Sequence, residues 1–256
     1  MTVWELAALF FAGVAAGTIN TVVGSGTLVT FPTLLAFGVP PVIANVSNTI
    51  GLFPGSVSGA IGYRRELAGQ RSRVWRLASA TAIGAAAGAV LLLVLPSAAF
   101  GAIVPILILL GLVLVVLQPR ISAAVARRHE HLGGLPEHGA GWVWPAIAGV
   151  GVYCGYFGAA QGVLCMAVLG SGVDDTLQRL NAVKNVLAAL GNGIAGLVFV
   201  IAAFGQVDWV IAGMLALGAT VGGQLGATWG RRLPAPVLRA LIVAVGSVAL
   251  VAFLLR

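Results

Sequence analysis

The chain has 256 residues, of which 59% are hydrophobic and 8% are charged, and its mean hydropathy is +1.04. Soluble domains carry about 25% charged residues, so this composition excludes a water-soluble globular core. The net charge of +7 would suit a nucleic-acid-binding protein, but the arginines flank apolar segments instead of forming one basic surface. We therefore expect no nucleic-acid partner and a chain that lies in the lipid bilayer.

Apolar tracts of about 20 residues recur along the whole chain, which is typical of an all-α, polytopic membrane protein. One long polar stretch, residues 118–141, separates them and is expected to be a cytoplasmic linker. It divides the chain into two predicted transmembrane repeats, 1–117 and 142–256. In chain order the tracts are 4–36, 41–61, 77–95 and 98–117, followed by 142–170, 177–204, 208–229 and 236–255.

The histidines and cysteines do not predict a metal site. His129, His131 and His138 all lie in the polar stretch. A solvated loop is the favoured interpretation there and a metal site the alternative, because we expect no helical scaffold that would fix ligand geometry. Cys154 and Cys165 share one apolar tract without CxxC spacing, so we interpret them as buried, small apolar side chains. No metal and no other cofactor is expected.

The two halves of the chain resemble each other in sequence at a nearly constant spacing. Because duplicated halves are the ordinary construction of secondary transporters, this resemblance predicts a transporter built from two repeats. The matches, which keep their order along the chain, are Ala12-Gly13-Val14 with Ala148-Gly149-Val150, Gly26 with Gly162, Asn45 with Asn181, Trp75 with Trp209, Gly84-Ala85 with Gly218-Ala219, Gly88 with Gly222, and Leu95-Pro96 with Leu233-Pro234.

One segment of the first half, residues 17–52, resembles the opening motif of the TauE/SafE sulfite exporter family, also called the TSUP transporters. The motif has a glycine-rich break, a proline, a Leu-Leu-x-x-Gly-x-Pro run and a small polar run. Here these are Gly24-Ser25-Gly26, Pro32, Leu34 to Pro40, and Asn45 to Thr49. The break is GSG, where the family often has more consecutive glycines.

The second half is similar to the family's second copy at Gln161-Gly162, at Asn181 to Asn185 and at Asp208-Trp209, although its break keeps a single glycine. The resemblance covers almost the whole chain. It implies a multi-pass protein of a bacterial inner membrane that transports a small sulfur anion, such as sulfite, thiosulfate or an organosulfonate. A homodimer is one option for its oligomeric state.

The interrupted tracts 4–36 and 142–170 leave two topologies open. The first tract would be about 50 Å long as a straight helix, too long for one upright crossing of a ~30 Å core and short for two. Single crossings divide the arginines between both sides, whereas fold-back puts every arginine except Arg256 on one side. The positive-inside rule favours fold-back. We therefore expect inverted repeats, each a glycine-broken hairpin plus three full spans, about eight to ten helical segments in all, with both termini outside.

In this topology the Gly24-Ser25-Gly26 break forms a hairpin tip, because non-helical backbone at membrane depth is tolerated only inside protein or beside a water-filled cavity. The helix that starts near Thr27 points free N–H groups and a positive dipole end at the tip, which predicts an anion site. A packing kink is the alternative. The second break, with polar Gln161 beside Gly162, favours the anion site.

Lys184 is the single lysine of the chain and lies inside the tract 177–204. Ionisable side chains inside a span are costly and usually functional, so we predict that its ammonium contacts the anion. Two alternatives stay open. The side chain could snorkel to the membrane interface, ~10 Å away along the helix, or it could form an ion pair with Asp174 or Asp175.

Small polar side chains lie at similar places in the two halves. Their amide N–H and hydroxyl groups can bind sulfur oxyanions without a full counter-charge, and hydrogen bonding between helices is the alternative role. Spacings of i, i+3 and i, i+4 put each amide pair on one helix face. These residues are Asn45, Ser47, Asn48 and Thr49 in the first half, and Asn181 and Asn185 in the second.

The carboxylates lie at tract ends or in loops, so we expect no proton or sodium relay through a mid-span carboxylate. An intramembrane hydrolase would need a nucleophile beside a base, or paired carboxylates, and the positions of the histidines and acids do not favour one. The favoured function is therefore an anion transporter and not an enzyme. A membrane scaffold or assembly protein without transport activity is the alternative.

Overall fold

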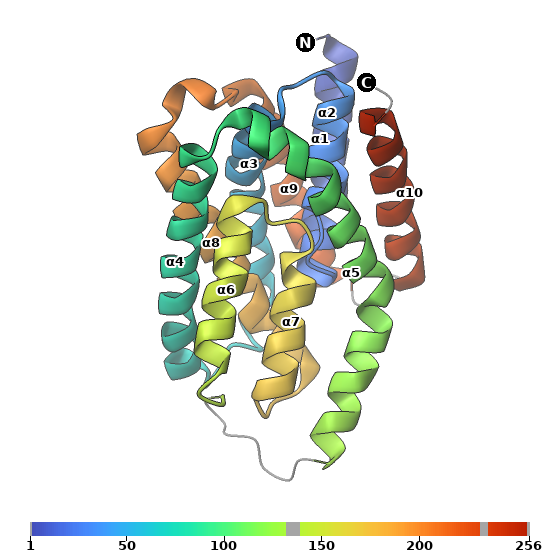
Figure 1. Ribbon diagram of the computed structural model, residues 1–256. Coiled ribbons are helices and arrows are strands. Elements are labelled where there is room, and N and C mark those ends of the chain that lie inside the picture. Colours follow the sequence, from blue (N-terminus) through green and yellow to red (C-terminus); the bar gives the residue numbers. More distant parts are fainter. Residues whose placement is uncertain (1, 132–138, 231–234, 255–256) are drawn as a thin grey trace.

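The computed structural model describes residues 2–131, 139–230 and 235–254, and within these ranges the regular structure is helical (Figure 1). The all-α prediction is confirmed. The elements are α1 (Val3–Val22), α2 (Thr27–Ala36), α3 (Pro41–Gly62), α4 (Arg71–Val94), α5 (Ser97–His131), α6 (Val143–Tyr156), α7 (Gln161–Gly172), α8 (Leu177–Ala202), η1 (Phe204–Gln206), α9 (Trp209–Thr228) and α10 (Ala235–Leu254).

Among the described residues, five helices are long and apolar enough to cross a membrane: α1, α4, the part of α5 from Ser97 to Ala124, α8 and α9. This supports a multi-pass membrane protein. By contrast, α2, α6 and α7 have 10, 14 and 12 residues, which makes each of them about 15–21 Å long. None of these three helices can cross a ~30 Å hydrocarbon core alone.

The short helices belong to two hairpins. In Figure 1, α1 and α2 run in opposite directions, and so do α6 and α7. Both interrupted tracts therefore fold back. The helix α1 begins, and α10 ends, at the end of the bundle opposite the α3–α4 loop and the C-terminal end of α5 (Figure 1). Because the α3–α4 loop is rich in arginine, the positive-inside rule predicts that its end of the bundle faces the cytoplasm, and we call it the cytoplasmic end.

The halves interlock instead of standing side by side. The helix α1 packs along α9 of the second half, and α6 packs along α4 of the first. The other contacts are also paired, because α3 meets α9 as α8 meets α4, and α2 meets α10 as α7 meets α5. Helices at corresponding places in the two halves therefore make corresponding contacts.

Matched glycines allow the closest of these approaches. An added Cβ on Gly84 or Gly88 of α4 would lie 2.1 Å from the Ala148 oxygen or 2.0 Å from the Val152 oxygen of α6. Their sequence matches in α9 behave in the same way, since an added Cβ would lie 2.1 Å from an α1 carbonyl oxygen in each case. Small residues at helix contacts are the usual means of close packing in membranes.

The polar stretch is not a loop throughout. The helix α5 continues through Pro119 to His131, so the prediction of a solvated loop is wrong for residues 118–131. Alanines at 123, 124 and 126 and the arginines beside them are good helix formers, and a cytoplasmic helix end can exchange backbone hydrogen bonds with water. Residues 132–138, including His138, lie outside the described residues.

Candidate functional site

The two glycine breaks meet inside the bundle. The N–H of Gly162, in the first turn of α7, donates a hydrogen bond of 3.0 Å to the carbonyl oxygen of Gly24, between α1 and α2. An added Cβ on Gly24 would lie 2.3 Å from the Cα of Gly162, and one on Gly162 would lie 2.4 Å from the Cα of Gly24. Because backbone atoms occupy both places, only glycine fits on either side of this contact.

A left-handed residue reverses the chain at each tip. Gly24 has φ +87°, and Ala160, just before α7, has φ +57°. Ala160 is the one non-glycine residue with positive φ among the described residues, and this conformation costs an L-residue about 1–2 kcal/mol. Phe157 packs edge-on against Phe31 of α2 at 5.0 Å between ring centroids, which fixes the second tip against the first hairpin.

The helices that start at the tips have no side-chain caps. Gly26 precedes α2 and Ala160 precedes α7, and neither makes a side-chain capping bond. Ser25 is 1% exposed, and its hydroxyl oxygen has no hydrogen-bond partner. The first break therefore places a buried, unpaired hydroxyl beside a helix N-terminus.

Lys184 reaches from α8 to the end of α1. Its side chain is 1% exposed, and its Nζ donates to the carbonyl oxygens of Asn20 at 3.0 Å and Thr21 at 3.2 Å. The ammonium therefore points into the protein, which excludes the snorkelling alternative. The carboxylate of Asp175 pairs instead with two arginines. The cation lies where the α1 dipole is negative and carbonyl groups lack helical partners.

The predicted amides make the same kind of contact across the two halves. Asn181 and Asn185 of α8 donate to the Thr21 oxygen at 3.4 and 3.3 Å, and Asn45 of α3 donates to the Tyr156 oxygen, at the end of α6, at 2.9 Å. Each amide set thus holds the end of the other half's hairpin helix. These bonds match the role between helices that the sequence left open, although the Asn45 Oδ1 atom is buried and unpaired.

The other small polar residues predicted for the site, Ser47, Asn48, Thr49 and Thr27, contact neighbouring protein groups or are buried. Asn48 accepts a hydrogen bond from the hydroxyl of Thr30 in α2. Ser47 accepts one from the backbone N–H of Asp208, before α9, at 2.9 Å. Thr49 donates to the Asn45 oxygen one turn back, and Thr27 is a buried residue of the first turn of α2. The structure thus turns Ser47 toward α9, away from the predicted tip site.

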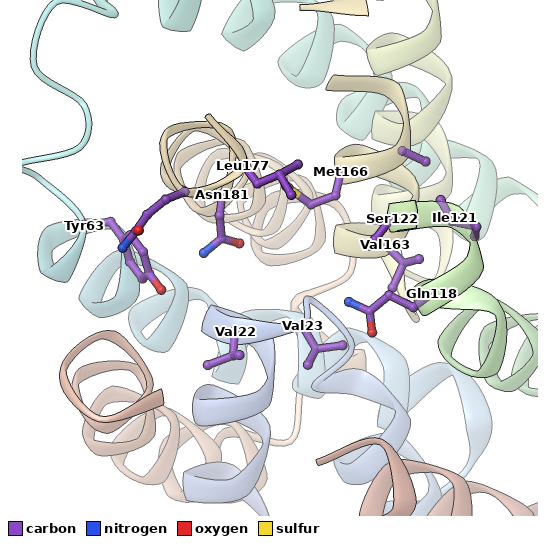
Figure 2. A pocket seen from close by; sticks show the side chains of 12 residues that line it. Val22, Val23, Tyr63, Gln118, Ile121, Ser122, Val163, Met166, Leu177 and Asn181 are labelled. Atoms are coloured by element: carbon purple, nitrogen blue, oxygen red, sulfur yellow. The ribbon is translucent and has the colours of Figure 1, made fainter. Parts of the chain in front are cut away.

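A cavity of about 360 Å³ lies between the first tip and the cytoplasmic end of the bundle. Figure 2 shows the amides of Asn181 and Gln118 on two sides of this space, near Val22 and Val23. No charged side chain is among its described lining residues. Four polar lining residues were not among the predicted site residues. Gln118 and Ser122 lie beyond the predicted end of the fourth span at residue 117, Tyr63 follows the tract 41–61, and Gln178 lies at the start of the tract 177–204.

A second, smaller cavity of about 20 Å³ adjoins the N-terminus of α7. Lys184 and Gln161 line it together with Cys154, Cys165 and apolar residues. Its volume suits about one water molecule. The structure therefore brings Gln161, Gly162 and Lys184 together behind the closed tips, and both cysteines are buried as predicted.

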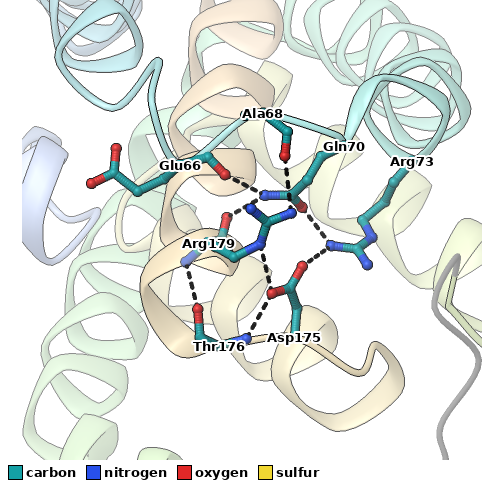
Figure 3. A network of polar contacts seen from close by, with 7 residues as sticks. All are labelled: Glu66, Ala68, Gln70, Arg73, Asp175, Thr176 and Arg179. Atoms are coloured by element: carbon teal, nitrogen blue, oxygen red, sulfur yellow. Dashed lines mark hydrogen bonds and ion pairs between the residues drawn. The ribbon is translucent and has the colours of Figure 1, made fainter.

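An ion-pair cluster joins the two halves at the cytoplasmic end (Figure 3). The carboxylate of Asp175, before α8, contacts Arg73 of α4 at 2.5 Å and Arg179 of α8 at 2.8 Å. Burial alone raises the pKa of the Asp175 carboxyl, but the bonds from Arg73 and the Thr176 N–H and the nearby arginine charges outweigh burial, so the pKa lies below its ordinary value. This carboxylate therefore links the start of α4 to the start of α8, away from the tips.

Comparisons with known proteins agree with this architecture. A family model described as sulfite exporter TauE/SafE matches residues 9–253. The "Probable membrane transporter protein YfcA" of Escherichia coli is 29% identical over 95% of this chain and 87% of its own length. The "Probable membrane transporter protein ORF9" of Sinorhizobium sp is 28% identical over 96% and 90%, and no solved structure matches. The chain therefore belongs to the TauE/SafE sulfite exporter family of multi-pass membrane transporters.

Proposed function

We propose that this transporter moves a small sulfur-containing anion, such as sulfite, thiosulfate or an organosulfonate, and that the anion binds between the two hairpin tips. The observation that carries the proposal is the direct contact of the two breaks, Gly24 to Gly162, beside the buried Lys184. The description of the matched family as a sulfite exporter supports a sulfur anion.

The electrostatics of the tips favour an anion. Two uncapped helix N-termini, of α2 and α7, start there, and each carries a partial positive charge of roughly half an elementary charge. Lys184 adds a full charge, while Ser25 and Gln161 add neutral polar groups. No acidic side chain is among the described residues that line either cavity, so nothing there opposes a negative ligand.

The tips are closed in this structure. The Gly162 N–H is bonded to the Gly24 oxygen, and the cavity beside Lys184 has about 20 Å³ of space, which is too little for a sulfonate. The anion therefore enters when the tips separate, and its route from the cytoplasm is the larger cavity below Val22 and Val23. Opening of the tips toward one side at a time gives alternating access.

Flux into reconstituted vesicles tests the proposal. The purified full chain should take up one or more of labelled sulfite, thiosulfate and methanesulfonate in a saturable way, above protein-free vesicles. A scaffold or assembly protein would give no flux above this control for any of these anions. A ligand that moves should also raise the thermal stability of the protein in detergent by mass action.

A pair of serine variants tests the location of the site. Ser25→Ala removes the unpaired hydroxyl at the tip, whereas Ser171→Ala removes a hydroxyl that bonds within α7, to the Ala167 oxygen. One hydrogen bond is worth about 0.5–1.5 kcal/mol, so Ser25→Ala should weaken anion binding by about two- to tenfold and Ser171→Ala should not. Equal affinities in the two variants would place the anion elsewhere.

A further inference from the structure

Lys184 occupies a position that usually belongs to a transported cation. In transporters with broken helices, carbonyl groups at the C-terminal ends of half-helices coordinate the coupling sodium ion or proton. Here the Lys184 ammonium lies on two such carbonyls, of Asn20 and Thr21, at the end of α1. The chain thus supplies its own cation at the end of the first hairpin helix.

The corresponding place in the other half carries no charge. The end of α6 is held by the neutral amide of Asn45. At the spacing that matches Asn45 with Asn181, Lys184 matches Asn48, which accepts a hydrogen bond from Thr30. Amide side chains are therefore sufficient to hold the end of a hairpin helix. The presence of the ionisable Lys184 at the end of α1 needs a separate explanation.

No carboxylate among the described residues that line the two cavities stabilises the charged form of Lys184. The titratable side chains that line its cavity are the thiols of Cys154 on α6 and Cys165 on α7, while α4 contributes Thr81. Tyr63, the residue that follows α3, lines the larger cavity. The two cavities have no carboxylate among their described lining residues, and a buried lysine changes protonation state readily.

A route for the proton exists on the cytoplasmic side. Asn181 precedes Lys184 by three residues, so the two share a face of α8, and Asn181 lines the larger cavity. Both side chains donate to the same Thr21 oxygen. A proton that leaves the ammonium therefore has less than one helical turn to travel before it reaches the larger cavity.

From these contacts we propose that Lys184 is the proton-coupling group of the transporter, so that one proton moves in the same direction as each anion. The ammonium form binds the anion and holds the end of α1. When Lys184 releases its proton to water in the larger cavity, the neutral amine no longer balances the anion, which leaves on the same side, and the hold on α1 weakens. For a monoanion the cycle moves no net charge. This inference rests on the proposed anion transport.

Hydrogen exchange tests the lysine without any substrate. The amides of the last turn of α1, residues 19–22, should lose protection, after correction for intrinsic exchange, by threefold or more in the wild type between about pH 6 and about pH 9. Lys184→Arg, whose charge is fixed, should stay protected across this range, and Lys184→Met should be poorly protected throughout. A wild type without this pH dependence, or an arginine variant that shares it, would overturn the proposal.

Transport of methanesulfonate, which does not titrate in this range, tests the coupling. In vesicles with the membrane potential clamped, a pH gradient should drive accumulation of methanesulfonate by the wild type. The Lys184→Arg variant should not accumulate the anion under this gradient, but it should retain part of the exchange of internal for external anion. Accumulation by the arginine variant would refute coupling through Lys184. If the wild type moves none of the anions tested, the proposed function fails. The hydrogen-exchange measurement still decides whether Lys184 titrates.

Discussion

Replacing a tip glycine by alanine can lower the stability of the protein in two ways, through backbone strain and through steric overlap with the other tip. Gly38 also has a left-handed φ, +79°, but an added Cβ there would meet nothing within 4 Å. Gly38→Ala therefore measures backbone strain alone, about 1–2 kcal/mol. Gly162→Ala has no such strain and measures the steric contact alone, about 1–3 kcal/mol for overpacking. Gly24→Ala combines both, so we expect about 2–5 kcal/mol.

Thermal unfolding in detergent, followed by loss of helical circular dichroism, measures these differences. One kcal/mol lowers Tm by about 2–4 °C for a domain of this size. The expected order of Tm is wild type, then Gly38→Ala and Gly162→Ala, then Gly24→Ala. In addition, the two tip variants should lose anion flux while Gly38→Ala keeps it. If Gly24→Ala and Gly38→Ala have the same Tm and the same flux, the tips do not meet as described.

Three further outcomes follow from the site. Lys184→Met should weaken anion binding by about tenfold to a hundredfold, because a charge-assisted contact is worth about 1.5–3 kcal/mol; unchanged affinity in calorimetric titration would remove Lys184 from the site. Ala160→Gly should stabilise the protein by about 1 kcal/mol by relieving its left-handed strain, and a lower Tm would contradict this account. Asp175→Asn should lower Tm at neutral pH but preserve flux in the folded protein. Because the pKa of Asp175 is lowered in the folded state, its stabilising effect is present above the unfolded-state pKa of about 3.9 and is lost as the pH falls through the folded-state value. A Tm difference that stays constant down to acidic pH would refute it.

The sequence predicted the features that depend on local chemistry. The apolar tracts, the two breaks and the arginine distribution each follow from composition and spacing, and the structure has the corresponding spans and hairpins. The glycines Gly84 and Gly218, and Gly88 and Gly222, were matched in sequence as parts of the two repeats, and in the structure they lie at equivalent close contacts. Their partners could not be predicted, because each glycine packs against a helix of the other half.

The same limit applies to the polar site residues. Amide spacing placed Asn181 and Asn185 on one face of a helix, but the carbonyl that they share belongs to Thr21, far away in the sequence. Ser47 looked equivalent to its neighbours and instead bonds to Asp208. Gln118 and Ser122 could have been found, since their i, i+4 spacing is what a helix continuing beyond residue 117 would produce.

Similar hydrogen bonds hold the ends of the two hairpin helices, but among the contacts described above an ionisable side chain contributes at the first hairpin only. Amides hold both hairpin ends, at the Tyr156 oxygen and at the Thr21 oxygen, and a neutral donor keeps the same bond whatever the pH or the ligand. At the first hairpin Lys184 adds bonds whose strength depends on its proton. An anion beside this lysine favours the protonated form, and the protonated form in turn favours the anion, because linkage is reciprocal. With the anion bound as proposed, one lysine in place of an asparagine is therefore enough to make two similar halves respond differently to it.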